Sequence, residues 1–133
     1  MVPSFEADSR FWYDTRTMGT LTAYGRNAVL QSGLPATLYV EAHSADPTDA
    51  GTVAKLAGVA RVAVPFAAAS GGSKVPSAGT YEFDILAGQT ISHVAYFDAS
   101  SNGNCYATDQ LDAAETYTGN GKYTLTSQTI SIT

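Results

Sequence analysis

The chain has 133 residues, the length of a single domain, and its 44% of apolar residues suffice to build a core. Its net charge of −5 and its 7 scattered basic residues argue against a nucleic-acid partner, which needs a concentrated basic face. No apolar stretch reaches the roughly 18 residues of a membrane-spanning helix. A single cysteine excludes an internal disulfide and a multi-cysteine zinc site.

Residues 1–19 are predicted to form an extended N-terminal arm, because they show neither a helical nor a strand period. The segment contains carboxylates and no apolar run, so we do not expect it to be a signal peptide. Its aromatic side chains have no core of their own and need a surface to lie on, which is either this domain or a neighbour. We expect them to bind a partner: Phe5, Phe11, Trp12 and Tyr13.

Residues 20–32 are the best helix candidate. Leu21, Tyr24 and Ala28 recur at the 3–4 spacing of one helix face. Gly33 offers a left-handed C-terminal stop, and Pro35 prevents the helix from continuing.

The pattern from residue 36 onward is that of strands and turns. The first strand is predicted over Thr37–His43, with Leu38, Val40 and Ala42 on one face and Tyr39, Glu41 and His43 on the other. In the turn over residues 44–51, Asp46 is expected to cap a short helical turn that begins at Pro47.

Further strands are expected at residues 59–66, 81–85, 91–98, 105–108, 123–126 and 128–133. Pro65 favours an edge position or a bulge, residues 67–78 are expected to form a loose loop, and Asn102-Gly103 is a strong hairpin signal. The sequence thus predicts a mainly β fold: a compact antiparallel β-sandwich or flattened barrel over residues 20–133, with one N-terminal helix. Its edge strands are expected to be available for pairing with other chains.

The two histidines are the first candidates for chemistry. His43 precedes Asp46 and Asp49 at a spacing from which a metal site can be imagined. No second histidine or cysteine stands at ligand spacing, so we expect a half-exposed strand histidine followed by a capped turn. His93 is expected to be a satisfied core or interface histidine.

Other candidate sites are equally weak. Cys105 follows a hairpin turn, where nothing lowers the pKa of its thiol, and is expected to be a small buried side chain. Residues 70–74 are rich in glycine and serine but lack the spacing of a phosphate-binding loop. Two carboxylate pairs lie on a solvent-facing strand and in a polar connection, respectively: Glu82 with Asp84, and Asp109 with Asp112. We therefore expect no catalysis, no metal and no cofactor.

Four blocks of the sequence, in order, resemble a known family. Residues 38–52 (LYVEAHSADPTDAGT) resemble the signature LYVALHTADPGDAGT of small tailed-phage virion proteins, and residues 60–72 resemble its YARQAVTFGAASGG block. Residues 91–99 (ISHVAYFDA) resemble ITHVGLFDA, and the Asn102-Gly103-Asn104 turn precedes the alternating C-terminal strand. The resemblance covers residues 21–133. Departures are Glu41, where the pattern has a small or apolar residue, Val59 in place of a tyrosine, and the arm.

The resemblance implies a non-enzymatic structural protein of the virion, assembled in the host cytoplasm, that binds other virion proteins and is a homo-oligomer. Because the chain has no coiled-coil heptads and no fibrous repeat, we expect a capsid-surface decoration or minor capsid subunit. The family's usual label supports the alternative of a tail fibre or minor tail protein. A carbohydrate- or host-surface-binding β module is a further alternative, in which tyrosines form stacking platforms: Tyr39, Tyr81, Tyr96, Tyr106, Tyr117 and Tyr123.

Overall fold

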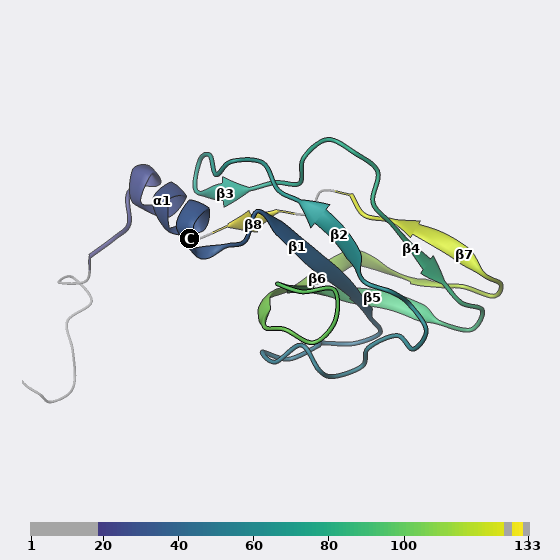
Figure 1. The fold of residues 1–133 in the computed structure, drawn as a ribbon. Helices are drawn as coiled ribbons and strands as arrows, with labels where there is room; N and C mark the ends of the chain where they lie inside the picture. The colour runs from purple at the N-terminus through teal and green to yellow at the C-terminus, as the bar shows by residue number, and fades with distance from the viewer. Residues whose placement is uncertain (1–18, 127–128, 132–133) are drawn as a thin grey trace, which may run out of the picture.

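The computed structural model describes residues 19–126 and 129–131 (Figure 1). The predicted helix is present as α1 (Ala23–Gly33), and Thr22 caps it by accepting a hydrogen bond from the Gly25 amide at 3.1 Å. The predicted glycine stop is wrong: Gly33 is the last helical residue, and the chain leaves the helix at Leu34 in an extended conformation. Pro35 explains this end, since the residue before a proline is pushed out of the helical region.

The apolar face predicted for α1 is not the face that it buries. Leu21, Tyr24 and Val29 are exposed, Tyr24 to 85%, and Leu30 is the buried residue of the helix. Polar contacts attach the helix to the segment that precedes β3: the Gly72 amide donates to Asn27 Oδ1 at 2.7 Å, and the Ala69 amide donates to Gln31 Oε1 at 2.9 Å. The helix stands beside β3 and β8, clear of the large sheet (Figure 1).

A four-stranded antiparallel sheet forms the larger layer, with the strand order β2-β1-β5-β6. Its strands are β1 (Thr37–His43), β2 (Val62–Pro65), β5 (Thr90–Phe97) and β6 (Cys105–Thr116). β2 lies at one edge, as Pro65 predicted, and β6 lies at the other.

Two strand pairs form the smaller layer: β4 (Glu82–Ile85) with β7 (Gly121–Thr124), and β3 (Ser73–Lys74) with β8 (Ile130–Ser131). The main core lies between this layer and the four-stranded sheet, where Phe83 and Ile85 of β4 belong to one cluster with Leu38, Val40 and Val94. The predicted mainly β antiparallel class is confirmed, and the sheets do not close into a barrel.

Two predicted connections contain regular structure instead. β6 continues to Thr116, so Asp109 and Asp112 lie in a strand and not in a connection. In the pairing of β5 with β6, Ile91 lies opposite Glu115 but His93 lies opposite Gln110. This irregular register disturbs the alternation of buried and exposed side chains from which strands are predicted. Residues 67–78 are likewise not a loose loop, because they contain β3 and contact α1.

Strand β1 is buried on both faces of the sheet. Leu38, Val40 and Ala42 face the main core as predicted, but Glu41 and His43 on the opposite face are also buried. The expectation of a half-exposed His43 is therefore wrong. The second face of β1 is covered by residues 44–61, which the chain adds between β1 and β2 (Figure 1).

Candidate functional site

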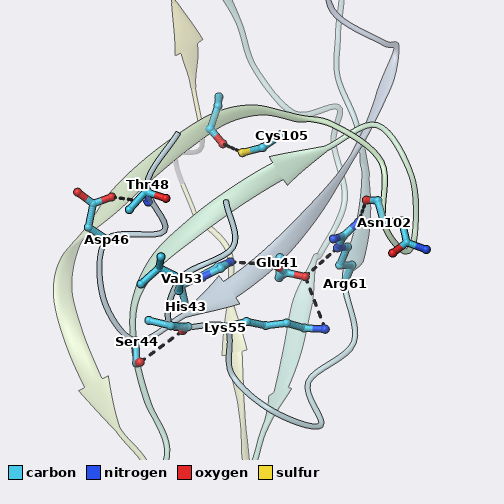
Figure 2. A network of polar contacts seen from close by, with 12 residues as sticks. Glu41, His43, Ser44, Asp46, Thr48, Val53, Lys55, Arg61, Asn102 and Cys105 are labelled. Atoms are coloured by element: carbon cyan, nitrogen blue, oxygen red, sulfur yellow. Dashed lines mark hydrogen bonds and ion pairs between the residues drawn. The ribbon is translucent and has the colours of Figure 1, made fainter. Parts of the chain in front are cut away.

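A buried carboxylate lies at the centre of the covered sheet face. Glu41 is only 3% exposed, and its Oε1 atom lies 2.8 Å from His43 Nε2. Its Oε2 atom accepts a hydrogen bond from Arg61 Nε at 2.9 Å and lies 3.7 Å from Lys55 Nζ. Both oxygens of Glu41 are thus engaged by basic side chains (Figure 2), which is the arrangement that a buried carboxylate requires.

The imidazole of His43 is held from both sides. Its Nδ1 atom lies 2.7 Å from the backbone carbonyl oxygen of Val53, while Nε2 faces Glu41. The ring is fully excluded from solvent, and its two nitrogens hold the Glu41 carboxylate and the Val53 carbonyl in place.

Arg61 connects the carboxylate to a second loop. Its Nη1 atom donates to the carbonyl oxygens of Ala99 and Asn102 at 2.7 and 2.8 Å. Its guanidinium carbon lies 3.7 Å from the centre of the Phe97 ring, a cation–π contact. The Arg61 side chain thereby fixes residues 98–104 against the N-terminal end of β2 (Figure 2).

Local contacts shape the 98–104 loop itself. The Asp98 carboxylate accepts hydrogen bonds from the backbone amide of Asn104 at 2.8 Å and from its side chain at 3.2 Å. These hydrogen bonds lower the pKa of Asp98 below its ordinary value. Asn102 and Gly103 both have positive φ angles, as the turn signal predicted, although they lie inside a longer loop.

The 44–61 loop is fixed in a similar way. Asp46 accepts a hydrogen bond from the Thr48 amide at 2.9 Å, but the helical turn predicted to begin at Pro47 is wrong, because Thr48 has a positive φ of 65°. Gly51 has a φ of 68° and lies so close to Phe97 and Cys105 that a Cβ atom there would come within 2.7 Å of the Phe97 ring and 2.8 Å of the sulfur. Only glycine combines this backbone conformation with this approach.

The two loops enclose a hollow of about 690 Å³ at this end of the sheet. Its basic side chains are Lys55, which is 54% exposed, and Arg61, which is 9% exposed. Polar residues from both loops, namely Thr52, Ser100, Ser101 and Asn102, share the lining with small and apolar residues such as Val59 and Phe97. The hollow therefore offers cations and hydroxyl groups to a bound molecule.

The structure places the predicted candidates in structural contacts. The ring nitrogens of His43 contact Glu41 and Val53, and the Asp46 carboxylate contacts the Thr48 amide. His93 is half-buried, and its Nδ1 atom lies 2.8 Å from the hydroxyl of Ser92. Among the residues that the structure describes, no three histidine, cysteine or acidic side chains gather around a possible metal position.

The remaining candidates are spread over the fold. Partial burial raises the pKa of the Cys105 thiol, which donates to the Ala107 carbonyl oxygen at 3.5 Å. Glu82 and Asp84 lie on the exposed face of β4, as predicted, and Asp84 pairs with Lys122 of β7.

The six tyrosines offered as stacking platforms lie mainly in the packing. Tyr96 is buried in the core, and burial raises its pKa far above the ordinary value. Tyr39, Tyr81, Tyr117 and Tyr123 are half-buried, whereas Tyr106 is exposed. The four aromatic residues of the predicted arm lie outside the described residues, so their role as partner contacts stays a prediction.

Sequence reasoning missed the importance of Glu41, Lys55 and Arg61. The available signal was a carboxylate in the middle of a strand whose other members are apolar or aromatic, since such a residue must find a basic partner if the strand is central. Glu41 is also the residue that departs from the phage signature.

The fold and the site together define a mainly β domain that holds two polar loops rigidly at one end of its larger sheet. The sequence profile of the family described as "Podophage GP4 fiber I protein gp80" matches residues 20–133, and the chain belongs to this family. This match confirms the predicted resemblance to small tailed-phage virion proteins. A search of curated proteins found no match. None of the helices within the described residues is long and apolar enough to cross a membrane.

Proposed function

We propose that this protein is a non-enzymatic structural component of the tail fibres of a podophage. The observation that carries the proposal is the family match over residues 20–133, whose description names a fibre protein. The match supports the tail fibre alternative better than the capsid-surface subunit that the lack of fibrous repeats predicted. A location on the virion tail and binding to other virion proteins follow from this proposal.

The use of the charged side chains supports a structural role. The Glu41 carboxylate is occupied by His43 and Arg61, and Asp84 pairs with Lys122. Asp98 accepts two hydrogen bonds from Asn104. A catalytic acid or base must instead be free to exchange a proton with a substrate, and these carboxylates are committed to holding strands and loops in place.

The exposed apolar side of α1 is the surface that we assign to neighbouring virion proteins. Tyr24 and Val29 are exposed on α1, and Leu21 is exposed just before it, where the chain follows the predicted aromatic arm. Exposed apolar and aromatic side chains are typical anchors of protein interfaces. The arm and α1 thus form one continuous attachment region in this proposal.

A deletion tests the attachment role. Removal of residues 2–16 is expected to leave a folded, soluble domain that no longer enters phage particles, since the described fold begins after the deleted segment. Circular dichroism checks the fold, and immunoblotting of purified particles checks incorporation. Unfolding of the truncated protein would show that the arm belongs to the domain's own core, and normal incorporation would refute its role in attachment.

A further inference from the structure

The lining of the hollow between the two loops holds two basic side chains, Lys55 and Arg61, against one carboxylate, Glu41, while Asp98 beside the lining interacts electrostatically with Arg61. Glu41 is the acidic residue in its lining, and His43 and Arg61 already engage both of its oxygens. Lys55 Nζ is 3.7 Å from this shared carboxylate, and Arg61 Nη2 has no hydrogen-bond partner among the described residues. In a chain with a net charge of −5, this is a local cationic site.

The rest of the lining suits a hydroxyl-rich ligand. Thr52, Ser100, Ser101 and Asn102 contribute hydroxyl and amide groups that can both donate and accept hydrogen bonds. The volume of about 690 Å³ lies within the ordinary range of small-molecule sites, about 300–1,000 Å³. The hydrogen bonds of Arg61 and Asp98 fix the 98–104 loop in advance, which lowers the entropic cost of binding.

We propose that this hollow binds a carboxylate-bearing saccharide, such as a uronic acid unit of a surface polysaccharide. The sugar carboxylate pairs with Lys55 Nζ and Arg61 Nη2, and the sugar hydroxyls bond to the 98–104 loop. That the saccharide comes from a host surface rests on the proposed fibre function. That the hollow binds such a saccharide rests on the lining of the hollow alone.

A protein partner fits this hollow less well. None of the exposed large apolar side chains in the described part of the chain lines it. Protein interfaces depend on aromatic or aliphatic anchors at their centre, whereas the large apolar side chains of this lining, Val59 and Phe97, are buried, and Arg61 lies over the Phe97 ring. Polar, charged lining without such anchors favours a saccharide.

The test titrates the full chain with a trimer of galacturonic acid. Binding is followed by the NMR chemical shifts of the backbone amides. We expect shifts confined to residues of the 44–61 and 98–104 loops, and no binding of the trimer's methyl ester, which lacks the charge. Lys55→Gln should weaken binding about tenfold. Lys122→Gln is the matched control, because Lys122 is similarly exposed but lies on β7. Lys55→Arg should retain binding.

Several results would overturn the proposal. These are the absence of shifts at millimolar trimer, equal effects of Lys55→Gln and Lys122→Gln, or equal binding of the methyl ester. Equal binding of inorganic phosphate would show a general anion site, and tighter binding of tri-glutamate would show a site for an acidic protein segment. None of these results changes where the protein lies in the particle, so failure here is distinguishable from failure of the fibre proposal.

Discussion

Replacing Glu41 by alanine tests the structural role of the buried network most directly. The substitution removes the carboxylate that His43 and Arg61 share, so the Arg61 guanidinium loses its counter-ion and the His43 ring loses a hydrogen-bond partner. His43 is 0% exposed and Arg61 is 9% exposed, so water compensates only partly for the lost carboxylate.

The expected cost follows from this burial. Removal of one partner of a buried ion pair typically costs about 3–5 kcal/mol. The cost falls on Arg61, which keeps its hydrogen bonds to the carbonyl oxygens of Ala99 and Asn102, so we expect the lower end, about 3 kcal/mol. For a domain of this size that loss corresponds to a fall in Tm of about 10 °C.

The assay is urea and thermal unfolding followed by circular dichroism. Glu82→Ala is the matched control, because Glu82 is also a strand carboxylate but is exposed, and it should leave the transition unchanged. In an Arg61→Met background the Glu41→Ala cost should fall below about 1 kcal/mol, since the stranded cation is gone. Equal effects of Glu41→Ala and Glu82→Ala, or fully additive costs in the double variant, would refute the reasoning.

Three further predictions concern the loops and the β6 side of the fold. Gly51→Ala should destabilise the protein by about 1–3 kcal/mol, because the residue has positive φ and the new Cβ meets Phe97; an unchanged unfolding midpoint would contradict this. Desolvation and the hydrogen bond to Glu115 raise the pKa of Tyr117 to about 12. Its contribution to stability is therefore complete below pH 10 and lost as the pH rises towards about 12, and Tyr117→Phe should remove one tyrosinate from the late part of an absorbance titration, in which Tyr96 and Tyr123 also titrate late. Partial burial raises the pKa of Cys105, so iodoacetamide should alkylate the native protein more slowly than the urea-unfolded chain, and equal rates would oppose this account.

The sequence predicts the strands of this fold where side chains alternate between core and solvent. β4 follows the rule fully, with Phe83 and Ile85 buried and Glu82 and Asp84 exposed. The rule fails in β6, where the irregular register opposite Ile91 and His93 breaks the alternation around Leu111. It also fails for the helix, since polar contacts from Asn27 and Gln31 decide which face of α1 is turned inward.

The candidate site was less predictable, because it depends on contacts between segments far apart in the sequence. The pairing of Glu41 with Arg61 joins residues 20 positions apart, and Arg61 reaches carbonyl oxygens 38 and 41 positions further along. Nothing in local composition shows that residues 44–61 fold back over β1 and bury its second face. The local hydrogen bond of Asp46 and the positive φ angles of Asn102 and Gly103 were predictable, whereas the helical turn after Asp46 and a tight hairpin at Asn102-Gly103 were wrong.

The central claim is that the protein belongs to the tail fibres of the particle. The most direct measurement is electron microscopy of intact phage carrying an epitope tag on this chain, with gold-labelled antibody. We predict label on the fibres at the tail. Label distributed over the capsid surface, or an absence of the protein from purified infectious particles, would contradict the account.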